Sequence, residues 1–469
     1  MVTFSKLFLL ALVLAAYVYA GPAAAQDCLS QELTLAEQKA VLRNNDDGDK
    51  GAGQESAPQH QSWLFHAQVT EIGQGQPGFH SPYRGENSLP PDDDFRQTSS
   101  MDIYLGAHTW PGGEIYLNAE YYQGFGLGRT HGIAAFPNAE AYKVGQKIGD
   151  VFVPHFFLRQ TFGLGGEKEE TPGDLLQLAE KQDVSRIIFM IGRLSVGDQF
   201  DGNAYAHDQR KQFINWVLVD SAAFDYAADS LGYIEGATLE LNQKDWAIRY
   251  GIFDVPRVSN GFAKDQHFDK AWQQVIELEE RFSVFDHPGK VRFLGWLEHA
   301  HMGSYRETLA HPEFMGDITL TRRYRYQYGV ALSVEQEIIK DIGAFVRASW
   351  RDGESEVWQF TDVDRNVSVG VQVKGSFWNR GNDTFGIAEF LSGISSAHRR
   401  YLAAGGLGPL LGDGKLPHYA LESVIEAYYD AEIIKHVHLA VDYQLAVNPA
   451  YNQDRGPINI FSGRMHVEF

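Results

Sequence analysis

Arginines, carboxylates and a few neutral polar residues in this sequence have the types and spacing needed for polar recognition. Guanidinium and carboxylate groups exchange hydrogen bonds with vicinal hydroxyls of a polar solute, and they also pair with one another. Strand alternation, described below, places several of them on a wetted face. The candidates for solute contact, or alternatively for ion pairs that only stabilise a wall, are Arg159, Arg193, Asp198, Asp201, Asn203, Tyr205, Asp208, Arg210, Arg249, Glu277, Glu279, Arg281 and Arg347.

Motifs of enzymes and metal sites are missing from the sequence. It contains no Gly-x-Ser-x-Gly elbow, P-loop or zinc-protease motif, so no catalytic residue and no cofactor is predicted. The acidic runs PPDDD (90–94) and DVDRN (362–366) could hold Ca²⁺, but the second lacks the glycine and distal glutamate of an EF-hand. The 17 histidines show no reliable metal-ligand spacing. We therefore predict no metal site.

From Trp63 onward the dominant period of apolar residues is two. Apolar and polar or small residues alternate clearly in residues 65–70, 101–108, 246–252, 367–373 and 437–443. Such alternation predicts strands that bury one face and wet the other. We expect an all-β protein, although for any one segment taken alone a soluble sandwich would fit better.

The connections between these strands are predicted to be of two kinds. Short ones are NQKD (242–245), HPGK (287–290) and KD (340–341), and long polar ones are residues 73–97 and 163–183. Alternating short and long connections are typical of transmembrane β-barrels, with short turns in the periplasm and long loops outside.

The first 61 residues differ from the rest of the chain. Lys6, the apolar run LFLLALVLAAYVYA (7–20) and three alanines at 23–25 predict a signal peptide over residues 1–25. We interpret residues 26–61 as a weakly helical periplasmic arm followed by a polar linker, or alternatively as a disordered leader. Cys28 is the only cysteine, which excludes an intrachain disulfide. A lipid anchor on Cys28 is disfavoured because AAQDC lacks the usual small residue before the cysteine.

The composition limits the classes of protein to which the chain could belong. After residue 25 no run of about 18 apolar residues occurs, so no transmembrane helix is predicted. Aromatic residues make up 13% of the chain and charged residues 22%, a balance that suits strands and turns. The net charge of −21 without a basic stripe argues against nucleic acid as a partner.

The last eight residues, SGRMHVEF, alternate and end on an aromatic ring. This pattern is similar to the terminal β-signal that the outer-membrane assembly machinery reads, with Phe469 as its final residue. In hydrocarbon every backbone polar group must be paired, so only helices and closed sheets span a membrane. We expect Phe461, Met465, Val467 and Phe469 to face lipid, and Arg464, His466 and Glu468 to face the lumen.

From Trp63 to Phe469 the chain resembles the carbohydrate-selective porins of the OprB family. The matching stretches are FHAQVTEIGQGQPGFHSPYRGENSL, EAYKVG, LRQTFGLGGE, GRLSVGDQFDGNAYAHDQRKQFINW, FDYAADSLGY, ELEERF, GKVRFLGW, HRRYLAAGGLGPLLGDG and NPAYNQDRGP. The resemblance implies a transmembrane antiparallel barrel over residues 62–469, with 16 strands (18 being the alternative), in the bacterial outer membrane. It also implies passive diffusion of sugars, with no enzymatic role and with outer-membrane lipid around the barrel; the choice between monomer and trimer stays open.

A sugar channel needs aromatic faces for the C–H faces of a pyranose and charged groups for its hydroxyls. Residues 201–216, DGNAYAHDQRKQFINW, lack alternation at their start and are interpreted as an ordered loop. This loop either folds inward to form the constriction or lies at the surface, held by Asp208 and Arg210. A competing function is binding, export or surface assembly of a polysaccharide, and another is a general pore that selects only by size.

Overall fold

The computed structural model describes residues 61–142 and 150–469. The predicted signal peptide and all but the last residue of the predicted arm lie outside the described residues. No helix in the described part of the chain is long and apolar enough to cross a membrane.

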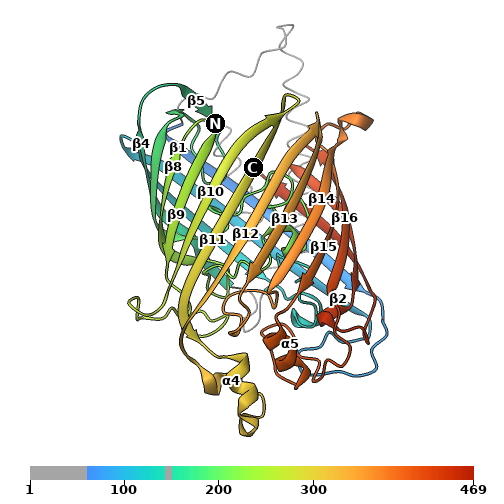
Figure 1. Cartoon of the computed structure of the whole chain (residues 1–469). Helices are drawn as coiled ribbons and strands as arrows, with labels where there is room; N and C mark the ends of the chain where they lie inside the picture. Colours follow the sequence, from blue (N-terminus) through green and yellow to red (C-terminus); the bar gives the residue numbers. More distant parts are fainter. Residues whose placement is uncertain (1–60, 143–149) are drawn as a thin grey trace. The chain divides into compact units, whose positions relative to one another are not determined.

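Sixteen strands of the described residues form one closed antiparallel barrel (Figure 1), which confirms the predicted fold class and the lower strand count. The barrel strands are β1 (Trp63–Gln76), β2 (Asp94–Trp110), β3 (Gly113–Gln123), β4 (Asp150–Gly163), β7 (Arg186–Leu194), β8 (Ile234–Asn242), β9 (Trp246–Phe253), β10 (Trp272–Val284), β11 (His287–Met302), β12 (Arg323–Ile339), β13 (Ile342–Arg351), β14 (Arg365–Lys374), β15 (Thr384–Gly393), β16 (Glu422–Ile434), β17 (Val437–Val447) and β18 (Ile458–Glu468). A separate hairpin pairs β5 (Lys168–Thr171) with β6 (Glu180–Asp183).

The alternation of residue types places one set of side chains outside the barrel and the other set inside, as predicted. In β14, Val367 and Val369 expose about half of their surface on the outer face (52% and 51%), whereas Ser368 between them is fully buried inside. β-Branched residues suit this pleated geometry. The outer face is therefore apolar and the inner face mostly polar.

The barrel closes where β18 pairs with β1, from Gln68 opposite Glu468 to Gly75 opposite Phe461. The main-chain N–H and carbonyl of Phe469 also pair with Ala67, at 2.9 and 3.0 Å. Phe461 and Phe469 are exposed on the outer face, and Arg464 is buried inside, as predicted. Closure leaves no edge strand with unpaired backbone groups. The role of Phe469 as an assembly signal stays a prediction.

Two predicted boundaries between strands are wrong. Residues 73–76 and 94–97 are paired strand residues, so the first long connection spans only residues 77–93. The predicted turn at 287–290 belongs to β11, and the turn is instead formed by Phe285 and Asp286, which adopt positive φ angles of 53° and 66°. A phenylalanine in the left-handed region is uncommon, which is why the residue types pointed to the neighbouring Pro-Gly.

The long connection at residues 163–183 is not at the predicted end of the barrel. Because β4 runs toward the end with the short turns, the β5–β6 hairpin that follows it lies at that end (Figure 1). Leu178, from this connection, is completely buried and packs with inward residues of the wall. The other long connections leave the opposite end, called the loop end below.

Short helices occur only in connections of the described chain. They are α3 (Trp216–Val219), α4 (Tyr305–Ala310) and α5 (Ser396–Ala403), together with the 3₁₀ turns η1 (Leu127–Arg129), η2 (Pro312–Phe314), η3 (Ile318–Thr321), η4 (Gly375–Trp378) and η5 (Pro449–Tyr451). Ser395 caps α5 by accepting a hydrogen bond from the His398 N–H at 3.0 Å.

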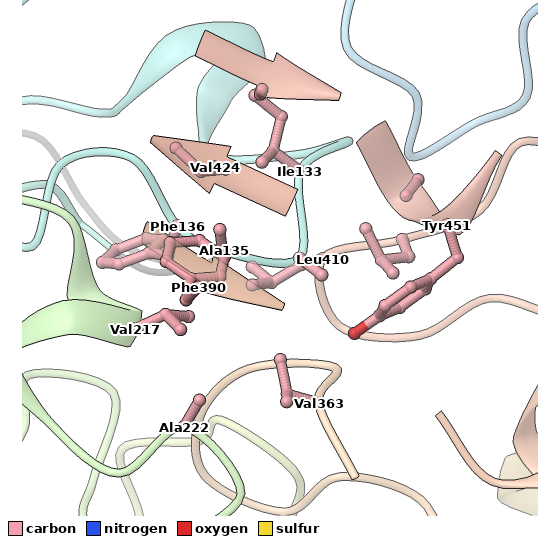
Figure 2. Packing of buried hydrophobic residues seen from close by; sticks show 14 of the residues in the cluster. Ile133, Ala135, Phe136, Val217, Ala222, Val363, Phe390, Leu410, Val424 and Tyr451 are labelled. Carbon is pink, nitrogen blue, oxygen red and sulfur yellow. The ribbon is translucent and has the colours of Figure 1, made fainter. Parts of the chain in front are cut away.

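A large apolar cluster lies inside the barrel (Figure 2). Connections supply Phe136, Val217 and Leu410, and the inner faces of β15 and β16 supply Phe390 and Val424. The connections therefore pack against the inner wall through a hydrophobic core, and they reduce the space available to a solute.

Carboxylates that have hydroxyl partners interrupt the apolar outer face on β1 and on β15. Glu71 on β1 accepts a hydrogen bond from the Ser99 hydroxyl at 2.7 Å, and Glu389 on β15 accepts one from the Ser423 hydroxyl at 3.3 Å. Each is flanked on its strand by outward residues of the apolar wall, and each has a hydroxyl partner on the next strand.

Candidate functional site in the barrel lumen

Residues 195–233, called the inward segment below, connect β7 to β8 and fold into the barrel. Their backbone is held by side chains from several strands of the wall. The N–H of Asp201 donates to Glu277 on β10 (2.7 Å), and the N–H of Ala204 donates to Glu335 on β12 (2.8 Å). Residues 201–216 therefore fold inward, which is one of the two predicted alternatives; their role as the constriction stays a prediction.

Arg347 on β13 is a main anchor of this segment. Its guanidinium is completely buried and donates to the carbonyls of Ala206 (2.6 Å), Leu218 (2.6 Å) and Asp201 (3.0 Å). Irregular backbone buried inside a protein needs such partners because unpaired carbonyls cost free energy. Arg347 was predicted to line the lumen. It lies on the inner face of the wall, but its side chain has no exposed surface, so its role is structural.

Arg210 anchors the same segment to the opposite part of the wall. Its guanidinium pairs with Asp102 on β2 (2.5 Å), Glu120 on β3 (2.8 Å) and Glu140 (2.9 Å). Three carboxyl groups therefore surround one guanidinium at this side of the lumen.

A cavity of about 150 Å³ lies between the inward segment and strands β3 and β4. Its lining includes these polar and aromatic side chains: Glu120, Tyr122, Glu140, Phe152, Asp198, His207, Gln209, Arg210, Trp216, Asp220, Tyr226 and Tyr233. Trp216 stacks on Phe360 at 4.7 Å between ring centroids. The cavity thus combines the two kinds of side chain that recognise a polyhydroxylated solute.

Asp220 is the most perturbed carboxylate of the inward segment. Its burial raises its pKa to about 6, and the nearby His207 opposes that rise. The His207 Nδ1 lies 3.9 Å from the Asp220 carboxylate. Asp220 therefore changes charge near pH 6, in the range where most carboxylates stay ionised.

Four of the predicted residues form a ladder on the inner wall instead of the cavity. Arg249 on β9 pairs with Glu277 (2.8 Å) and Glu279 (3.1 Å) on β10, and Glu279 also pairs with Arg281 (2.7 Å). Arg292 on β11 extends this ladder to Glu335. Ion-pair ladders of this kind stabilise the wall and hold the inward segment.

The other predicted residues of the inward segment have separate positions. Asp198 lines the cavity and accepts from His155 at 2.7 Å, whereas Asn203 donates to Ser333 at 3.2 Å. Tyr205 lies against Gly343, where a Cβ would overlap its ring. Asp208 caps a turn by accepting from the Arg210 N–H at 2.8 Å.

Two predicted lumen residues are not in the channel centre. Arg193 shares its strand face with the exposed Phe189 and Ile191, so it faces outward, and it pairs there with Asp229 at 2.5 Å. This placement corrects the prediction; it is possible because a charge at the loop end of the wall lies beyond the apolar band. Arg159 faces inward but near the short turns, where it donates to Gln177 at 3.0 Å.

Two further wall residues anchor the inward segment. Glu426 was not among the predicted residues, and Arg464 was predicted to face the lumen but not to hold a loop. Glu426 on β16 accepts from the N–H groups of Ile214 (2.6 Å) and Asn215 (3.1 Å). Arg464 on β18 donates to the carbonyls of Gln209 and Gln212 at 2.8 and 2.7 Å. Strand alternation placed Arg464 on the wetted face, and the same alternation would have placed Glu426 there.

One group of side chains in the described residues has the spacing of metal ligands. His108, Glu114 and Glu180 have ligand atoms within 4.8 Å of one another. However, Glu114 faces the ring Nδ1 (3.7 Å) and Glu180 faces Nε2 (3.8 Å). Because one ion binds only one nitrogen of a ring, we interpret the group as carboxylates flanking an imidazole.

A closed sixteen-stranded barrel with an apolar outer face and a segment folded into a charged lumen defines a porin of the bacterial outer membrane. The model of the family "Carbohydrate-selective porin, OprB family" matches residues 86–469. The chain therefore belongs to the OprB family of carbohydrate-selective porins, and it is an outer-membrane channel for carbohydrates. No match was found among curated proteins.

Solved structures are similar in fold. OprB of Pseudomonas putida, in its high-pH structure, superposes with a TM-score of 0.65 at 13% identity over 87% of this chain and 94% of that chain. The channel DcaP of Acinetobacter baumannii (TM-score 0.47, 9% identity, 90% and 100% covered) and OmpT of Vibrio cholerae in a trimer form (0.45, 12%, 88% and 100%) are less similar.

The anchoring of the inward segment predicts the effect of Arg347→Met. Three buried carbonyls would lose their donor, which favours local detachment of the segment by about 3 kcal/mol. We expect larger single-channel conductance with more current noise in a planar bilayer. Arg281→Met, which removes an arginine of the wall ladder that does not contact the segment, is the control. Equal conductance in both variants and the unmodified protein would contradict the anchoring.

The raised pKa of Asp220 predicts a pH dependence of sugar binding. Above pH 6 the charged carboxylate accepts hydrogen bonds from hydroxyls more strongly than the neutral acid does, by about 1 kcal/mol. Sugar block of the ion current should therefore weaken about fivefold as the pH falls from 7.5 to 5.

Asp220→Asn should flatten this profile, whereas Asp208→Asn, outside the cavity lining, should retain it. An unchanged profile in Asp220→Asn would show that another group is responsible.

Proposed function

We propose that this porin passes neutral monosaccharides and small oligosaccharides by passive diffusion, and that they contact the cavity between the inward segment and strands β3 and β4. The observation that supports this most is the lining itself, in which Trp216 and Tyr233 stand beside Asp198, Asp220 and Gln209. Aromatic rings and hydrogen-bonding groups at one place suit a pyranose.

The charge of the lining favours neutral solutes. Glu120, Glu140, Asp198 and Asp220 outnumber the cationic Arg210, which already pairs with two of these carboxylates. An anionic sugar would meet repulsion in a confined space where charges are poorly screened. Selection by charge as well as size distinguishes this proposal from a general pore.

Export or surface assembly of a polysaccharide is the alternative function. The inward segment and the apolar cluster of Figure 2 pack against the inner wall and narrow the path that a polymer would need. Weak binding is what a diffusion channel requires, because a solute that is held tightly is not released. A dissociation constant near 1 mM, about −4 kcal/mol, meets this requirement.

Trp216 gives the sharpest test of the proposal. Trp216→Ala should weaken block of the current by neutral disaccharides about fivefold, because an aromatic face contributes about 1 kcal/mol. Trp216→Phe, which keeps a ring, should retain most of the block. Saturable block in single-channel records is the measurement. Block by an anionic oligosaccharide as strong as block by neutral sugars would contradict the proposal.

A further inference from the structure

An apolar groove of about 450 Å³ is present on the outer face of the barrel, across strands β11 to β15. We call it the rim groove and define it by the lining residues Phe293, Leu332, Ala348, Trp350, Leu391 and Leu421. The small Ala348 leaves space between larger neighbours. The groove opens toward the hydrocarbon of the membrane, so a flexible apolar chain can enter it from the bilayer.

Arg365 lies at one end of the rim groove. It is the first residue of β14 after the preceding connection, so it marks the loop end of the barrel. Its side chain is exposed on the outer face. Within residues 61–142 and 150–469 its guanidinium has no hydrogen-bond or ion-pair partner, although the chain as a whole has a net charge of −21.

A second arginine is close to the same place. Side chains of Arg365, Leu421 and Tyr419 meet at Gly393. Their nearest atoms lie 2.8, 2.8 and 3.1 Å from the position that a Cβ would take on this glycine. The Arg399 guanidinium on α5 lies 5.3 Å from the centroid of the Tyr419 ring. Arg399 is exposed, and within the described chain it too has no carboxylate partner.

We propose that the rim groove, Arg365 and Arg399 bind an anionic, phosphate-bearing lipid of the outer leaflet. One acyl chain occupies the groove and the phosphate pairs with the two guanidinium groups. The loop end of such a barrel faces the outside, so both arginines lie at the level of outer-leaflet headgroups. Guanidinium groups are the side chains best suited to phosphate, and basic pockets at a bilayer surface recognise lipid headgroups.

This arrangement meets two requirements for specific lipid binding, and a wall that is only exposed to lipid does not meet both. A chain-shaped recess alone would accept any acyl chain, and exposed arginines alone would accept any anion. Here the recess ends at the arginines, and Trp350 in its lining is a residue type that favours the membrane interface. The site therefore discriminates by headgroup charge and by the presence of a chain.

Native mass spectrometry of the purified full-length chain in detergent tests the proposal. The probes are a doubly phosphorylated lipid A, the same lipid without phosphates, and inorganic phosphate. We expect one tightly retained phosphorylated lipid, at least about tenfold weaker retention of the dephosphorylated lipid, and no competition by millimolar inorganic phosphate.

Matched variants locate the site. Arg365→Gln combined with Arg399→Gln should weaken retention of the phosphorylated lipid about tenfold, and Ala348→Phe, which fills the groove, should weaken it with both arginines intact. Arg400→Gln is the control, because this exposed neighbour on α5 bonds only the Ser396 carbonyl of its own helix among the described residues. Unchanged sugar-blocked conductance in each variant shows that the barrel is folded.

Several outcomes would overturn the proposal. Equal retention of phosphorylated and dephosphorylated lipid would exclude the arginines from binding, and effective competition by inorganic phosphate would exclude the groove. Retention that survives Ala348→Phe and the double arginine substitution would place the lipid elsewhere. Dimers that appear only without added lipid would show that the groove is covered by a second copy of the chain.

Discussion

The irregular backbone inside this barrel can exist only if the wall supplies its hydrogen-bond partners. Residues 195–233 contain carbonyl and N–H groups that no neighbouring strand can pair. Wall arginines such as Arg347 and Arg464 donate to the carbonyls, and wall carboxylates such as Glu277 and Glu426 accept from the N–H groups. The charges of the lumen are therefore first of all a scaffold for the inward segment.

This scaffold determines the chemistry of the channel. Once most guanidinium groups are bound to carbonyls or carboxylates, the groups that remain at the cavity are mainly carboxylates and aromatic rings. A neutral polyhydroxylated solute can use both, whereas an anion meets repulsion. The outer wall obeys a different constraint, because its residues face hydrocarbon and its exposed arginines occur at the rim, where lipid headgroups begin.

The strands could be predicted from the sequence because lipid outside and water inside impose a strict alternation on each of them. The same alternation placed Arg464 in the lumen, could have found Glu426, and would have placed Arg193 outside, beside Ile191. The path of the inward segment could not be predicted, since contacts such as Arg347 with Ala206 join residues 141 positions apart. The turn at Phe285 was missed because its residue types do not indicate a left-handed backbone.

The central claim is that the inward segment lines the path of the sugar. Chemical modification of Gln209→Cys in a Cys28→Ser background tests it most directly, because Gln209 lines the cavity and Cys28 is the only native cysteine. A methanethiosulfonate reagent added to single open channels should lower the conductance in steps, and a neutral disaccharide should slow the modification. Complete modification, verified by mass, with unchanged conductance and no protection by sugar would contradict the account.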